Sequence, residues 1–78
     1  MTEYVPHGSE RERHDWIIDH ADYFTVVRYK NMHYERHETK SLAEAKRVAR
    51  TLAQAFPEKP WMIYAVSGVS DTLVETVT

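Results

Sequence analysis

Residues 23–56 decide the fold, and they read YFTVVRYK at 23–30, NM at 31–32, HYERHET at 33–39 and KSLAEAKRVARTLAQAF at 40–56. β-Branched and aromatic side chains dominate 23–30, which favours a strand, and 33–39 resumes the strand after a break. Asn31 tolerates a positive φ, whereas Met32 does so less comfortably. The sequence therefore predicts a β-hairpin closed by a two-residue turn or by a four-residue loop through Lys30 and His33.

A tight turn in this hairpin would create two cross-strand pairs. Tyr29 and Tyr34 would lie directly or diagonally opposite each other on one face, and Arg28 would pair with Glu35 on the other. Aromatic and opposite-charge pairs of this kind each contribute about 0.2–1 kcal/mol.

A helix follows the hairpin. The hydroxyl of Ser41 can accept a hydrogen bond from the backbone N–H of Glu44, while the Glu44 carboxylate reaches back, as in a capping box. Pro57 cannot continue the helical hydrogen bonds and ends the helix. Apolar residues recur with a helical period and predict one buried stripe: Leu42, Ala45, Val48, Ala49, Leu52 and Phe56.

Two further strands complete the chain. Residues 61–66 (WMIYAV) are apolar on both faces, which indicates a central strand with Trp61 in the core. Residues 67–71 (SGVSD) predict a turn, and 72–77 (TLVETV) predict a fourth strand in a hairpin with the third. The expected fold class is α+β, an antiparallel β-β-α-β-β sheet with one amphipathic helix packed on one face.

Residues 1–22 are interpreted as an acidic N-terminal arm or a short helix, and 23–78 as a single α+β domain. Ser9 and Glu12 have capping-box spacing. Trp16, Ile17 and Ile18 fit either the apolar side of that short helix or an extended segment. One helix leaves the second face of the sheet without a cover, and that face is expected to be screened by the segment with Trp16, by a partner or by water.

Size and composition exclude several classes of protein. Seventy-eight residues form one marginal core, so good packing or oligomerisation has to stabilise it. The absence of cysteine excludes disulfides and thiolate metal sites. No apolar run reaches the roughly 20 residues of a membrane span, and no secretory signal is visible. A cytoplasmic protein without membrane contact is expected.

Charge is distributed unevenly along the chain. Residues 1–22 hold six acidic side chains against two basic ones, whereas 23–59 hold eight basic against four acidic. Such a division indicates an interaction surface. Alternatively, the acidic N-terminal segment lies against the basic middle of its own chain.

Chemistry-bearing residues are present, but they match no catalytic or cofactor motif. Five histidines are high for this length. His33 and His37 share one strand face about 13 Å apart, too far for one metal ion, so a site would need His20 or Asp22 as well. The acidic and imidazole groups of 14–22 are interpreted as a solvated segment. We expect no catalytic, cofactor-binding or metal-binding residues and no enzymatic activity.

The order of hairpin and helix loosely resembles the arm-binding modules of phage integrases and double-stranded-RNA-binding domains. The integrase module ends in its helix after three strands, whereas this chain continues through 61–77. The RNA-binding domain has helices at both ends and a basic helix start that this chain lacks. No functional residue is transferred from either family.

The sequence favours a small non-enzymatic binding or accessory protein, of the kind found among phage-type and bacterial regulators. A protein partner is expected, with self-association into a homodimer as one form of it. One alternative is a nucleic-acid-binding module that uses the basic helix face and the hairpin. A second is a small metal-binding protein. The predicted interaction surface comprises Arg28, Tyr29, Tyr34, Arg36, Lys46, Arg47 and Arg50.

Overall fold

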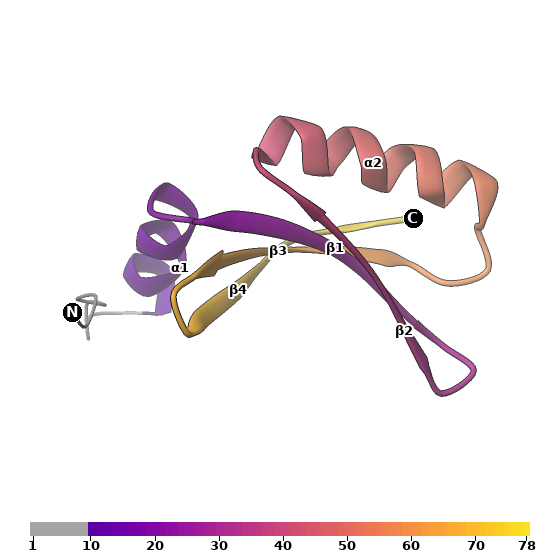
Figure 1. Ribbon diagram of the computed structural model, residues 1–78, viewed down its shortest axis with the longest axis horizontal. Helices are drawn as coiled ribbons and strands as arrows, with labels where there is room; N and C mark the ends of the chain where they lie inside the picture. Colours follow the sequence, from indigo (N-terminus) through magenta and orange to yellow (C-terminus); the bar gives the residue numbers. More distant parts are fainter. Residues whose placement is uncertain (1–9) are drawn as a thin grey trace.

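The computed structural model describes residues 10–78, and this part of the chain forms two helices and one four-stranded sheet (Figure 1). After the first helix the order is β-β-α-β-β, so the predicted α+β class is confirmed. The elements are α1 (Glu10–Asp19), β1 (Tyr23–Lys30), β2 (His33–Thr39), α2 (Leu42–Ala55), β3 (Trp61–Ser67) and β4 (Ser70–Val77).

The strands lie in the order β2-β1-β3-β4 and every neighbouring pair is antiparallel. The expectation that 61–66 forms a central strand is confirmed, because β3 pairs with both β1 and β4. The backbone N–H of Asp22 extends the pairing of β1 with β3 by donating to the carbonyl of Val66 at 2.7 Å. The pairing of β1 with β3 brings the two most apolar strands to the centre of the sheet.

The hairpin between β1 and β2 closes with the two-residue turn. Asn31 and Met32 have φ values of 51° and 69°, and Lys30 pairs directly with His33. Positive φ at both turn positions matches the right-handed twist of the strands, and this match favours the tight turn over the longer loop. Met32 therefore occupies a strained backbone region that its side chain does not favour.

Helix α2 covers one face of the sheet (Figure 1), and its buried side chains are small. Ala45, Ala49 and Ala53 are the buried residues of this helix, and they let its backbone approach the strands closely. The predicted cap is present, since Ser41 Oγ accepts from Glu44 N–H at 3.1 Å. The predicted stripe needs one correction. Phe56, the C-terminal cap residue, is 45 % exposed, and Ala53 takes its place in the core.

Helix α1 packs against the same face as α2. Ile17 is fully buried in the core cluster that contains Trp61, and Trp16 packs against the edge of that cluster. His14 Nδ1 lies 2.9 Å from Thr72 Oγ1, and this contact links the helix to β4.

The helical interpretation of this segment is thus confirmed. The expectation that it could screen the second face is wrong, because Ile17 belongs to the first. The proposed cap at Ser9 lies outside the described residues.

The turn between β3 and β4 is shorter than the sequence indicates. Ser67 pairs with Ser70, so that only Gly68 and Val69 lie between the strands. Gly68 has a φ of 59°, which glycine adopts without a steric penalty, and its N–H donates to Asp22 Oδ2 at 2.8 Å. In residues 10–78, neither helix has the length and apolar character needed to cross a membrane.

Candidate functional site: the open face of the sheet

The second face of the sheet carries side chains that neither α1 nor α2 covers. Residues alternate between the two faces of a strand, and the strand registers fix which ones share this side. We call it the open face. It comprises Tyr23, Thr25, Val27, Tyr29, Tyr34, Arg36, Glu38, Met62, Tyr64, Val66, Asp71, Leu73 and Thr76.

A shallow hollow of about 420 Å³ lies on the open face, over the middle of the sheet. Thr25 and Val27 form its floor and are each 5 % exposed. Tyr23, Tyr34 and Tyr64 line it from three different strands. Tyrosine combines a flat apolar ring with a hydroxyl, so this hollow offers contacts to apolar and polar groups together.

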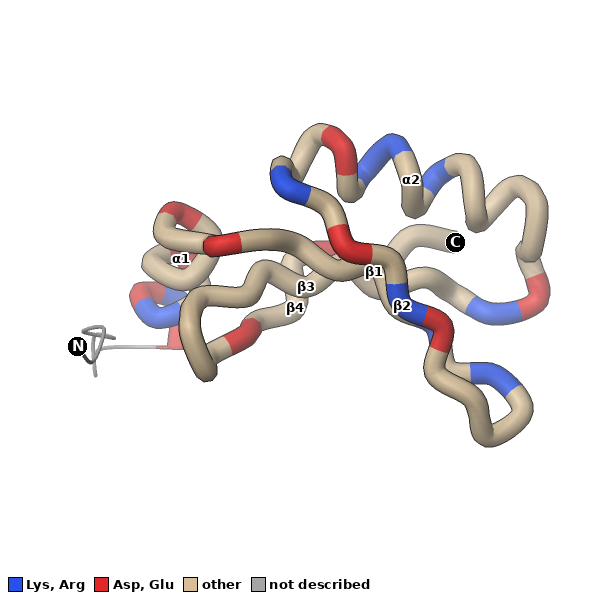
Figure 2. Tube along the Cα trace, viewed as in Figure 1, with Lys and Arg blue, Asp and Glu red and all other residues tan. Residues whose placement is uncertain are grey.

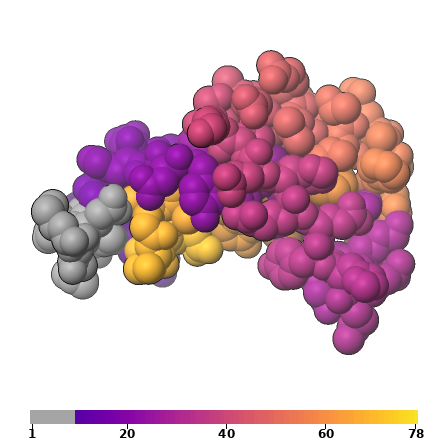
Figure 3. Space-filling model, in the orientation of Figure 1, coloured from indigo at the N-terminus to yellow at the C-terminus, as the bar shows by residue number. Residues whose placement is uncertain are grey.

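Tyr29 and Tyr34 extend the open face toward the hairpin turn. They are directly opposite in the register, and their rings meet edge to face with centroids 5.7 Å apart. The sequence-based prediction of this pair is confirmed. Tyr29 is 50 % and Tyr34 is 69 % exposed, which is high for large side chains. The hairpin tip that carries them projects away from α2 (Figure 3).

Arg36 is the basic group of the open face. Its guanidinium carbon lies 5.7 Å from the centre of the Tyr23 ring, and its Nη2 donates to Glu38 Oε1 at 3.2 Å. Asp71 adds a second acidic side chain to the hollow. The open face is therefore aromatic and close to neutral in charge.

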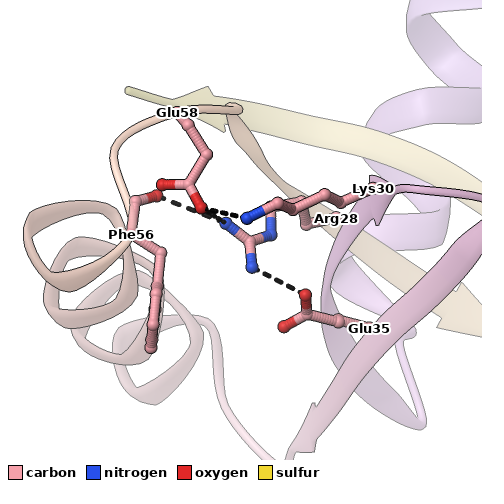
Figure 4. Close-up of polar contacts among 5 residues, drawn as sticks. All are labelled: Arg28, Lys30, Glu35, Phe56 and Glu58. Atoms are coloured by element: carbon pink, nitrogen blue, oxygen red, sulfur yellow. Dashed lines mark hydrogen bonds and ion pairs between the residues drawn. The ribbon is translucent and has the colours of Figure 1, made fainter.

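Arg28 departs from the predicted interaction surface, because its side chain is buried on the face that α2 covers and is only 3 % exposed. Its Nη2 donates to Glu35 Oε1 at 2.6 Å, so the predicted pair with Glu35 is confirmed. Its guanidinium carbon lies 4.5 Å from the centroid of the Trp61 ring and 5.4 Å from that of Phe56. Arg28 joins β1, β2 and the segment after α2 (Figure 4).

Glu58 completes this cluster from the loop before β3. It accepts hydrogen bonds from Lys30 and, at 3.4 Å, from Arg28 Nη1 (Figure 4). The hydrogen bond from Lys30 is the main cause that lowers the pKa of Glu58 from its ordinary value of 4.5. Its own backbone N–H and the charge of Arg28 act in the same direction. The cluster stabilises the fold and presents no free basic group to a partner.

The basic residues of α2 lie on the opposite side of the molecule from the open face (Figure 2). Arg47 and Arg50 are exposed, and Lys46 approaches Glu75 at 4.0 Å. The predicted interaction surface is thus divided into two. Tyr29, Tyr34 and Arg36 belong to the open face, whereas the three α2 residues belong to the other side of the sheet.

Three histidines of the described residues make different local contacts. His20 stacks on Trp16 with ring centroids 4.2 Å apart. The ring centroid of His37 lies 5.9 Å from that of the buried Trp61. In residues 10–78, no group of three or more His, Asp or Glu side chains converges as metal ligands would. The pair of His14 and Thr72 links α1 to β4, and we assign it a structural role.

Several residues of the open face were absent from the predicted surface, among them Tyr23, Val27 and Val66. Alternation from Tyr29 along β1 could have indicated Tyr23 and Val27. The contribution of β3 could not be found in this way, because its register with β1 connects segments that are distant in the sequence.

Comparison with known proteins gives no match, whether with family models, curated proteins or solved structures.

Proposed function

We propose that this chain is a small cytoplasmic, non-enzymatic binding or accessory protein that holds a protein partner on its open face. The observation that carries the proposal is the exposure of Tyr29 and Tyr34 beside a tyrosine-lined hollow. Exposed aromatic patches generally mark interaction surfaces, and tyrosine is enriched in the energetically important centres of protein interfaces. A second copy of the chain is one partner that this proposal includes.

The charge of the open face favours protein over nucleic acid. Affinity for nucleic acid comes mainly from neutralised phosphates. Arg36 pairs with Glu38, and Asp71 lies nearby, so the face offers little net positive charge. A nucleic-acid ligand would need the basic side of α2, which lies across the sheet from the tyrosines that could stack on bases. This separation weakens the nucleic-acid alternative.

Affinity capture with matched variants tests the proposal. The bait is the intact chain, and the lysate comes from the organism of origin. A Tyr29→Ser/Tyr34→Ser variant removes the aromatic pair, and a Lys46→Gln/Arg50→Gln variant on α2 serves as the control. We expect the same partner with the wild type and the control and its loss with the tyrosine variant. Partner retention by the tyrosine variant would refute the role of the open face.

Sedimentation and nucleic-acid titration test the remaining forms of the hypothesis. A dimer that dissociates in the tyrosine variant would identify the partner as a second copy. Titration with single- and double-stranded DNA and RNA at low salt tests the alternative. An absence of binding at low salt would eliminate the nucleic-acid alternative. Binding that is lost in the α2 variant would instead favour this alternative over our proposal.

A further inference from the structure

Strand β2 forms one edge of the sheet, and among the described residues no strand pairs with its outer side (Figure 1). In a hairpin with a two-residue turn, the residues that flank the turn exchange both hydrogen bonds, and the pattern then alternates. Lys30 and His33 flank this turn. The backbone N–H and C=O groups of Tyr34, Arg36 and Glu38 therefore point outward from the edge.

A groove of about 250 Å³ lies between this edge and α2. His37 contributes to it from β2, and Arg47, Val48, Thr51 and Leu52 contribute from the helix. Val48 and Leu52 pack against the core and remain partly exposed, so the groove has an apolar floor. It lies on the side of the sheet that α2 covers and is separate from the open face.

A basic side chain borders this groove. Arg47 lines it, and Lys40 lies between the end of β2 and the start of α2. In residues 10–78, neither of these two basic residues makes an ion pair, whereas the acidic residues of α1 lie at the other end of the molecule (Figure 2). The groove is thus complementary to a ligand that is apolar and negatively charged.

We propose that the edge of β2 and the adjoining groove bind an extended, acidic segment of a partner protein as an added strand. The outward backbone groups of Tyr34, Arg36 and Glu38 hydrogen-bond the segment. One apolar side chain of the segment enters the groove over Val48, and a carboxylate nearby pairs with Arg47. Strand addition gains affinity from main-chain hydrogen bonds and specificity from pockets for alternate side chains. This site is distinct from the open face and does not depend on the function proposed for it.

The charged side chains of β2 fit this role. Charged residues on an edge strand prevent indiscriminate pairing with other chains. Arg36 and Glu38 both face away from the groove and already pair with each other. They can therefore discourage aggregation at the edge while leaving the groove, with its Arg47 border, available to one kind of segment.

Selection from a displayed library of random linear peptides, against the intact protein, tests the proposal. We expect enriched peptides that combine acidic residues with β-branched or other apolar residues and lack proline. An Arg47→Glu variant should bind the enriched peptide at least about tenfold more weakly, since it reverses one paired charge. Arg11→Glu on α1 makes the same change in net charge and should bind as the wild type does. Thermal melts verify that both variants fold.

Two measurements on the selected peptide separate strand addition from other modes of binding. N-methylation of the peptide amides that face β2 should abolish binding. N-methylation of the intervening amides, which face away from β2, should leave binding intact. Amide hydrogen exchange of the protein should slow at Tyr34, Arg36 and Glu38. Enrichment of basic peptides, or unchanged exchange at these three amides, would overturn the proposal. So would a lack of enrichment together with Arg47-dependent binding of a labelled oligothymidylate, which would identify a nucleic-acid surface instead.

Discussion

The two faces of the sheet are built from alternate residues of the same strands, yet they differ in chemistry. The covered face presents Val26, Ile63 and Trp61, all fully buried beneath alanines of α2. The open face presents four tyrosines and a paired arginine beside apolar residues such as Val27 and Val66. Aliphatic side chains gain most from removal from water, whereas tyrosine tolerates both water and a protein partner. This difference indicates that the covered face contributes most to stability, and it is consistent with the binding role that we propose for the open face.

Substitution of one tryptophan and one tyrosine on the same strand gives the sharpest test of this comparison. Trp61→Ala should lower the free energy of unfolding by about 3–5 kcal/mol, because it leaves a large cavity in the core. Tyr64→Ala on the open face should cost about 1 kcal/mol, since Tyr64 is only partly buried. Urea denaturation measures both values. Equal losses would contradict the assignment of separate roles to the two faces.

Arg28 is the polar exception on the covered face, and its substitution should have the next largest effect. Arg28→Ala removes a buried cation from Glu35, Glu58 and the Trp61 ring. We expect a loss of about 2–4 kcal/mol in unfolding free energy, with Arg28→Leu less destabilising because it refills the volume. Thermal denaturation followed by circular dichroism ranks the wild type, Arg28→Leu and Arg28→Ala by stability. A value for Arg28→Ala within about 0.5 kcal/mol of the wild type would show that the cluster contributes little.

The tyrosine pair of the open face should contribute a smaller amount. A double-mutant cycle over Tyr29→Ala and Tyr34→Ala isolates the coupling between the two rings. Exposed aromatic pairs that meet edge to face contribute about 0.5 kcal/mol at the lower end of the measured range. Chemical denaturation of the four proteins of the cycle gives this coupling. A value above about 2 kcal/mol would mean that the pair belongs to the stabilising core after all.

The smallest expected effect is a dependence of stability on pH at Glu58. Its pKa is lower in the folded state than its ordinary value of 4.5, chiefly because Lys30 donates to the ionised carboxylate. The resulting stabilisation is present above pH 4.5 and disappears as the pH falls through the lowered pKa. The urea midpoint should therefore decline less below pH 4.5 in Glu58→Gln than in the wild type. Parallel curves for the two proteins would exclude this linkage.

Local sequence features predicted most elements of the fold. The Ser41 cap and Pro57 delimit α2, and the strand propensity around Asn31 identifies the hairpin with its Tyr29 and Tyr34 pair. These predictions succeeded because capping, propensity and turn geometry act between residues close in the chain. The candidate site was predicted in part. Tyr29, Tyr34 and Arg36 were placed together correctly, but the division between the open face and the basic side of α2 was not foreseen.

Arg28 illustrates why the remainder required the tertiary structure. In the sequence it is one more basic residue on a charged hairpin. Its burial depends on Trp61 and Glu58, which reach it only after α2 has crossed the sheet and β3 has paired with β1. Burial that depends on segments distant in the chain leaves no local pattern by which it could be recognised.

The sequence by itself determined the identity and order of the main elements, because hydrophobic period, capping and turn chemistry are properties of short segments. It also determined the tyrosine pair, since a hairpin fixes its own register. Only the tertiary structure decided that β3 lies beside β1, that both helices occupy one face and that the other remains open. Those outcomes depend on the burial of Trp61, Ile17 and the alanines of α2 together, and non-local packing of this kind is set by the whole chain.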